Sequence, residues 1–300
     1  MEQINKYRKI AEHYANVLQK DPNVLCILLG GSTHYGFLDE DSNLNLIVIV
    51  SDGKIGEKNY SCYYEDVIVN IDVCERVDYV KVLSDQEGSI DLISYIVHTE
   101  VLYTCDRMLT AIKEECASIG KDAAEVHIFF DLTEIILYMH IIKKWLIQKK
   151  DISYIRFNFM MVTPIIARIE FLKKGMIPPK DKVALAKQIN PEIMSRFYEE
   201  SVNKEWTQEQ CYEGLQMLEH YVNDNIVDTQ RVITKLFSIQ QKDVLTVNEI
   251  AKHYGVYAPF VNIGCQYLVH KKILGHSVEY VSFLKKGNVK VEESAYYLLA

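Results

Sequence analysis

The chain has 300 residues, of which 49% are hydrophobic and 25% are charged, and its formal net charge is −8 at pH 7. This composition is typical of globular proteins and excludes a largely disordered chain, while the acidic balance argues against broad attraction to nucleic acid or acidic membranes. The seven cysteines form no Cys-x-x-Cys pair and no apolar run approaches the roughly 18 to 20 residues of a membrane span, so we expect a reduced, cytoplasmic protein with no membrane partner and no zinc site.

The first 118 residues predict a mixed α/β domain. Apolar residues at helical spacing indicate an amphipathic helix over residues 2–20, which Asp21-Pro22-Asn23 then stops. Two β-rich runs, 24–29 and 44–50, flank a polar loop that starts at Gly30-Gly31. The remaining elements expected in this domain are a hairpin at 59–64 and 67–73, helices near 76–86 and 88–97, and a short strand at 100–103.

Residues 119–242 predict a helical bundle, and residues 243–300 a smaller third domain. One broad apolar face over 128–145 and the helix-breaking Pro178-Pro179 pair indicate the bundle and a turn within it. The tail begins with Thr246 and Glu249 at capping-box spacing, followed by two helices and an alternating β-ribbon. This order is the outline of a winged-helix-like domain.

The loop after the first strand has the residues of a phosphate-binding turn. Glycine at 30 and 31 lets the backbone approach a phosphate without Cβ interference, and Ser32 offers a hydroxyl and an N–H. His34 lies in the same loop and could touch a nucleotide. We therefore predict nucleotide binding by Gly30, Gly31, Ser32 and His34.

The segment from Leu29 to Val48 closely resembles the signature of the DNA polymerase β-type nucleotidyltransferase superfamily, as in kanamycin nucleotidyltransferase. There a Gly-Ser turn precedes an Asp-x-Asp motif on the next strand, and a third carboxylate lies on a neighbouring strand. The resemblance implies transfer of a nucleotide monophosphate from a nucleoside triphosphate, ATP first, to a hydroxyl acceptor with Mg²⁺. Carried over, it places the catalytic and metal-binding positions at Asn43, Asn45 and Asp72.

Asparagine at 43 and 45 is the departure from the family. Asparagine is nearly isosteric with aspartate but neutral, and Mg²⁺ is usually held through carboxylates and phosphates, so we expect weak or absent Mg²⁺ binding and lost catalysis. A natural pseudo-enzyme and a variant inactivated by paired Asp→Asn changes both fit. Compensation by the nearby acids Asp39, Glu40 or Asp41 is a further alternative.

The order of the three domains resembles the YgxA-type nucleotidyltransferase-like proteins of low-GC Gram-positive bacteria over nearly the full length. In kanamycin-type relatives the bundle helps to bind the acceptor with a glutamate as base, which implies Asp131, Glu134 or Glu170 as candidates here. Arg156 and Arg168 suit either a phosphate or a buried ion pair.

Three functions therefore stay open: a nucleotidyltransferase inactive as written, a non-catalytic nucleotide-binding regulator with a winged-helix output domain, and a toxin-like enzyme that modifies RNA or protein. Residues 245–300 contain six lysines, four glutamates and no arginine, so DNA binding by the tail is possible but not favoured over protein contact. The acceptor and the oligomeric state are not specified by these patterns.

Overall fold

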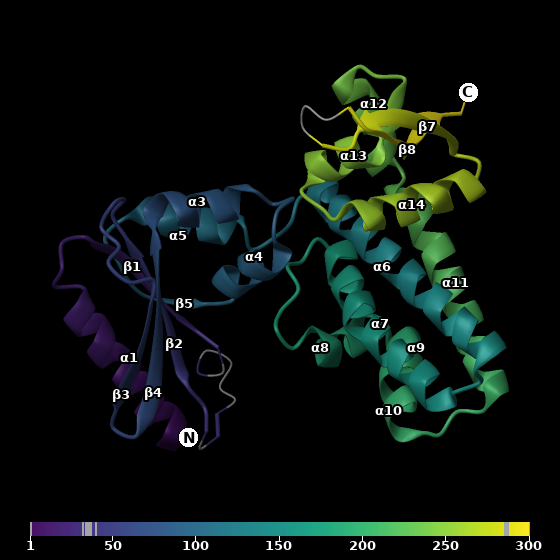
Figure 1. The fold of residues 1–300 in the computed structure, drawn as a ribbon. Helices are drawn as coiled ribbons and strands as arrows, with labels where there is room; N and C mark the ends of the chain where they lie inside the picture. The colour runs from purple at the N-terminus through teal and green to yellow at the C-terminus, as the bar shows by residue number, and fades with distance from the viewer. Residues whose placement is uncertain (1, 32, 34–37, 40, 285–287, 300) are drawn as a thin grey trace. The chain divides into compact units, whose positions relative to one another are not determined.

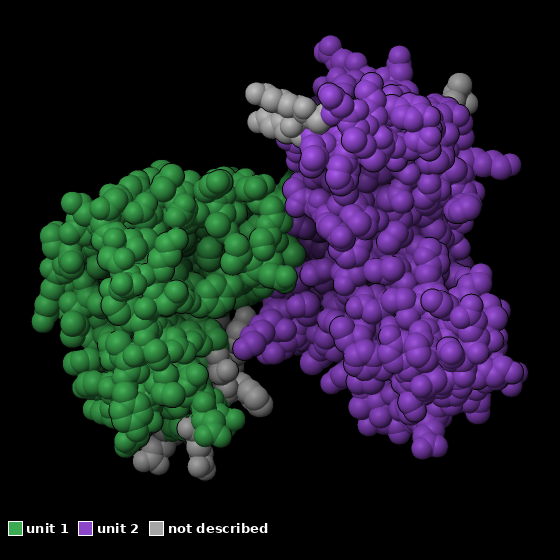
Figure 2. Space-filling view, viewed as in Figure 1, with its two compact units in different colours: residues 1–119 green, residues 120–300 purple. Residues whose placement is uncertain are grey.

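The computed structural model describes residues 2–31, 33, 38–39, 41–284 and 288–299. The chain divides into two compact units, residues 1–119 and 120–300, shown in different colours in Figure 2. The second unit contains both the predicted bundle and the predicted C-terminal segment.

The first unit is a five-stranded sheet with helices on both faces. Its strands are β1 (Val24–Gly30), β2 (Leu44–Val50), β3 (Asn59–Tyr64), β4 (Val67–Glu75) and β5 (Glu100–Thr104), in the order β3-β4-β2-β1-β5. The β2–β4 pair is parallel, and the other pairs are antiparallel. Its helices are α1 (Glu2–Leu18), α3 (Arg76–Ser84), α4 (Ile90–Val97) and α5 (Arg107–Glu115).

Both faces of the central strands are covered, which explains their nearly continuous apolar sequences. On one face, the helix α1 places Tyr7, Ile10 and Ala11 in a core with alternate residues of β1, β2 and β4. On the other face, α3 packs against β2 and β4 and buries Tyr79 and Leu83 (Figure 1). The helices and strands predicted for this region are thus confirmed. They form one sheet with helices packed on both of its faces.

The second unit is built around the long helix α6 (Lys121–Gln148), which packs against α7 (Ile152–Lys173), α11 (Gln208–Thr229) and α14 (Ala258–His270). Pro178 and Pro179 lie between α7 and the next helix, as their backbone chemistry predicts. The shorter helical elements between α7 and α11 are α8 (Lys182–Ile189), α9 (Pro191–Met194), the π-helical turn η1 (Ser195–Glu200) and α10 (Ser201–Asn203).

The last part of the second unit alternates short helices with a small sheet. In chain order it contains α12 (Arg231–Gln240), β6 (Val244–Thr246), α13 (Val247–Tyr254), α14, β7 (Leu274–Ser282) and β8 (Lys290–Leu298). The antiparallel sheet has the order β6-β8-β7. The capping box predicted from Thr246 and Glu249 is present at the start of α13. Across the described part of the chain, no helix combines the length and apolarity that a bilayer crossing needs.

Candidate nucleotide site

The site starts at the turn that ends β1. Gly30 is paired with Asn45 of β2, and Gly31 has a φ of +73°, a backbone conformation that favours glycine. A Cβ atom on Gly31 would lie 2.7 Å from Nδ2 of Asn45. The turn therefore requires glycine for two reasons, and the amide of Asn45 lies directly against it.

A row of neutral polar side chains continues from this turn across three strands. The register places Asn45 of β2 opposite Asn70 of β4, and Asn70 opposite Ser61 of β3. Nδ2 of Asn70 donates to Oδ1 of Asn45 at 3.2 Å, and the Ser61 hydroxyl donates to Oδ1 of Asn70 at 3.2 Å. Asn70 and Ser61 are thus members of the site that the sequence motif did not point to.

Asp72 lies two residues after Asn70 on β4 and is not the partner of Asn45. The register places it opposite Ile47 of β2 and Asn59 of β3, about 7 Å along the strand from Asn70. The Tyr95 hydroxyl of α4 donates to its Oδ2 at 2.8 Å. The Asn59 amide, with its nitrogen toward Asp72, donates to Oδ1 at 2.8 Å. The Asp72 carboxylate is therefore hydrogen-bonded to both α4 and β3.

The contact with Asp72 also affects the pKa of the Tyr95 phenol. Burial raises the pKa of the Tyr95 phenol, and the hydrogen bond to the Asp72 carboxylate raises it further. The proton thus stays on the phenol, which keeps it a donor to Asp72 well into the alkaline range.

The other predicted positions belong to the segment between β1 and β2. Asn43 is exposed just before β2, whereas Ser32, His34 and Glu40 lie outside the described residues. Asp39 closes a turn, since its carboxylate accepts from the Ser42 hydroxyl at 2.7 Å. The Asp39 carboxylate therefore has a partner within its own loop.

These residues do not fit a divalent metal ion. Mg²⁺ is usually bound through carboxylates and phosphates, but the row at the glycine turn consists of two amides and a hydroxyl. Within the described ranges no group of three or more histidine, cysteine, aspartate or glutamate side chains could hold a metal.

In the second unit, the acids and arginine expected at an acceptor site contact one another. Arg168 of α7 donates from Nε to Oδ2 of the buried Asp131 of α6 at 2.8 Å, and its Nη2 pairs with Oδ1. Burial, and the neighbouring Asp131 charge, raise the pKa of Glu134, an effect that Arg168 opposes. Of the two roles that suited Arg168, the structure has the ion pair.

Glu170 and Arg156 also have partners inside the bundle. The buried Glu170 accepts from the Tyr221 hydroxyl at 2.7 Å and from Lys173 at 3.3 Å. Burial and the Glu170 carboxylate raise the pKa of Tyr221 well above its ordinary value. Nη2 of Arg156 donates to the Ser201 carbonyl at 2.7 Å. These contacts tie the helices together.

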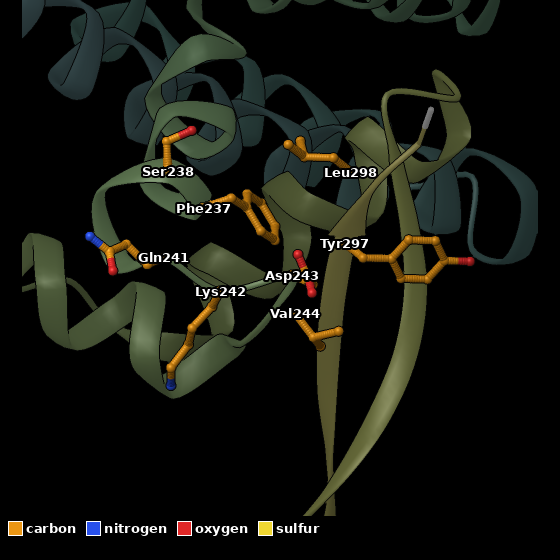
Figure 3. Close-up of a pocket in the computed structure, with 8 residues that line it drawn as sticks. All are labelled: Phe237, Ser238, Gln241, Lys242, Asp243, Val244, Tyr297 and Leu298. Carbon is orange, nitrogen blue, oxygen red and sulfur yellow. The ribbon is translucent and has the colours of Figure 1, made fainter.

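A pocket of about 530 Å³ lies in the last part of the second unit, between the end of α12 and β8 (Figure 3). Its one lysine, Lys242, forms an ion pair with Glu249 of α13. None of the residues predicted for nucleotide or metal binding lines it. The lining residues are Phe237, Ser238, Gln241, Lys242, Asp243, Val244, Tyr297 and Leu298.

Comparison with solved structures identifies the class of fold to which this glycine turn and sheet belong. A nucleotidyltransferase-like protein from Exiguobacterium sibiricum 255-15 matches with a TM-score of 0.63 and 14% sequence identity, covering 99% of this chain and 100% of that chain. No protein-family model matches the chain, and the search of curated proteins gave no match. At this identity, the likeness shows the nucleotidyltransferase fold.

Proposed function

We propose that this chain is a nucleotide-binding protein that keeps the nucleotidyltransferase fold but does not transfer a nucleotide monophosphate to a hydroxyl acceptor. The observation that carries the proposal is the hydrogen-bonded row of Asn45, Asn70 and Ser61 beside the glycine turn. Nucleotidyl transfer needs a divalent ion to neutralise the charge on the phosphates, and neutral side chains hold such an ion poorly. Loss of catalysis with retention of the turn is the outcome that this combination favours.

The ligand proposed for the turn is a nucleoside triphosphate, with ATP as the first candidate. The positive φ of Gly31 and the absence of side chains at Gly30 and Gly31 support close approach of a phosphate to the backbone. Contributions from Ser32 and His34 remain predictions. A hydroxyl acceptor, whether a small molecule or a macromolecule, is then not modified.

The end of the chain is proposed to be a winged-helix-type output module that contacts protein. The order α12, β6, α13, α14, β7, β8 and the sheet order β6-β8-β7 support this class. The helix α14 contains no lysine or arginine within Ala258–His270, which disfavours reading of DNA bases. The proposed combination is a nucleotide sensor with a protein-binding output.

The test is calorimetric titration of ATP and of GTP into the full chain, with a parallel assay for transfer of a labelled nucleotide monophosphate. We expect binding of at least one nucleotide and no transfer above the rate without protein. No binding of either nucleotide would remove the proposal, and measurable transfer would remove its claim of lost catalysis.

Two glycine variants locate the binding. Gly31→Ala should weaken nucleotide binding about tenfold or more, because the added Cβ displaces the Asn45 amide and closes the approach to the backbone. Gly53→Ala is the matched control, since Gly53 has a φ of +72° and nothing within 4 Å of its Cβ position. Both variants carry the same left-handed strain of about 1–2 kcal/mol, so only a steric effect at the turn separates them. Equal affinities in the two variants would place the nucleotide elsewhere.

A further inference from the structure

The row of amides beside the glycine turn has a direction. Hydrogen bonds run from the Ser61 hydroxyl to Oδ1 of Asn70, and from Nδ2 of Asn70 to Oδ1 of Asn45. Each amide oxygen in the row therefore accepts a hydrogen bond from its neighbour. The end of the row at the turn is Nδ2 of Asn45, which is a donor.

The position of that donor fits a ligand rather than a cation. Nδ2 of Asn45 lies 2.7 Å from the Cβ position of Gly31, directly at the turn, and it makes no hydrogen bond to any residue that the structure describes. A metal ion needs a lone pair at this point, whereas a phosphate oxygen needs an N–H. The amide, unlike an aspartate carboxylate, adds no negative charge that would repel the phosphate.

A second observation comes from the residue two places after Gly31. Thr33 is only 7% exposed, and its hydroxyl has no hydrogen-bond partner in the described part of the chain. A buried polar group without a partner is unfavourable, so a ligand with polar oxygens that reached this hydroxyl would relieve the deficit.

We propose that this site takes a phosphate-bearing ligand free of divalent metal, with Asn45 as the binding donor and Asn70 as the residue that positions it. The proposal rests on the proposed nucleotide-binding function and specifies its chemistry. Asn70 holds Oδ1 of Asn45 and so directs Nδ2 toward the turn. The register, with Asn70 and not Asp72 opposite Asn45, makes this arrangement possible.

The experiment is titration of ATP into the full chain, once in EDTA and once in excess Mg²⁺, with inorganic triphosphate as a second probe. We expect the Kd of ATP in EDTA to be equal to or lower than the Kd in Mg²⁺, because the donor row binds the free phosphate. Binding at least about tenfold tighter in Mg²⁺ would overturn the metal-free proposal while leaving nucleotide binding intact. Absence of binding in both buffers, for GTP as well as for ATP, would overturn this proposal together with the proposed function. Binding of ATP without binding of triphosphate would place recognition on the nucleoside and overturn the phosphate assignment.

Asn45→Asp is the decisive variant, because it replaces the donor by a charged acceptor of nearly equal size. We expect it to weaken ATP binding in EDTA about tenfold or more and to make the remaining binding dependent on Mg²⁺. Asn16→Asp on α1 is the matched control: it adds the same charge at an exposed position of the helix that covers the opposite face of the sheet. An unchanged ratio of the two Kd values in Asn45→Asp would contradict the role of Asn45.

Asn70→Ala tests the positioning role. It should weaken ATP binding in EDTA by about three- to tenfold. Asn70→Ser should retain more affinity than Asn70→Ala, because the serine hydroxyl can donate to Oδ1 of Asn45. Thermal unfolding of each variant separates this effect from loss of structure. A stable Asn70→Ala protein with the original Kd in EDTA would exclude Asn70 from the site.

Discussion

Asn70 of β4 donates its side-chain amide to Asn45 of β2 at 3.2 Å, across the parallel pair of strands at the centre of the first unit. The contact joins residues 25 positions apart in the chain. The cross-strand neighbour of Asn45 is therefore an amide. The nearest acid on β4, Asp72, lies two residues further along that strand and accepts a hydrogen bond from Tyr95.

Carboxylates at these two neighbouring positions should create a metal site. In the Asn45→Asp, Asn70→Asp double variant, like charges lie directly opposite, so we expect a loss of stability on the order of 1 kcal/mol without metal. Added Mg²⁺ or Mn²⁺ should raise the Tm by binding the folded state. Asn43→Asp with Asn45→Asp, which leaves Asn70 in place, should respond less. Equal responses of the two double variants in differential scanning calorimetry would show that a carboxylate at position 70 adds nothing to metal binding.

Tyr95 and Asp72 should contribute to stability and not to ligand binding. Tyr95→Phe removes a hydrogen bond to a carboxylate at a partly exposed position, so the free energy of unfolding should fall by about 1 kcal/mol. Urea denaturation measures this loss. Tyr60→Phe on β3 is the control, because that hydroxyl is exposed and has no hydrogen-bond partner in the described residues. If Tyr95→Phe instead changed nucleotide affinity at unchanged stability, Asp72 would return to the binding site.

The Arg76–Asp106 pair should make the stability of the first unit depend on pH in the acid range. Nε of Arg76 donates to Oδ2 of Asp106 at 2.8 Å, and this hydrogen bond lowers the pKa of the Asp106 carboxyl below its ordinary value. The stabilisation is therefore fully present above the unfolded-state pKa of about 4 and is lost as the pH falls through the lower pKa of the folded state.

Arg76→Ala tests this dependence. At pH 7 it should reduce the free energy of unfolding by about 1 kcal/mol, and the difference from the unmodified chain should shrink below pH 4. Denaturation at pH 7, 5 and 3 measures it. Arg8→Ala, which removes a more exposed pair with Glu100, is the control and should cost less. A difference that grows toward pH 3 would contradict the assignment.

Arg168 should be a stabilising residue of the second unit. Arg168→Ala leaves the buried Asp131 without its arginine partner, which should lower the free energy of unfolding by about 3 kcal/mol or more. The Arg168→Met, Asp131→Asn pair should recover part of the loss, since it removes both charges. Lys187→Ala, at an exposed pair with Glu199, is the control and should cost less than about 1 kcal/mol. Unchanged stability together with weaker ligand binding would support the alternative role of Arg168 in binding a phosphate or carboxylate.

Local sequence patterns were sufficient for the elements and for the turn. Apolar runs at 24–29 and 44–50 predicted the two buried strands, and the glycines between them predicted a turn that favours glycine, because side-chain alternation and backbone freedom depend on neighbouring residues. The same patterns predicted the helical second unit and the capping box at Thr246.

The composition of the site was decided by tertiary structure. Alternation places Asn70 and Asp72 on one face of β4, but it does not say which of them faces Asn45, since that depends on the register between strands separated by a long crossover. Likewise, the pairing of Arg168 with Asp131 depends on how α6 and α7 pack. The sequence by itself determined a nucleotidyltransferase-like layout with asparagine at 43 and 45. Only the packed sheet decided that the Asn70 amide, and not the Asp72 carboxylate, lies opposite Asn45, because register is fixed by the packing of both sheet faces at once.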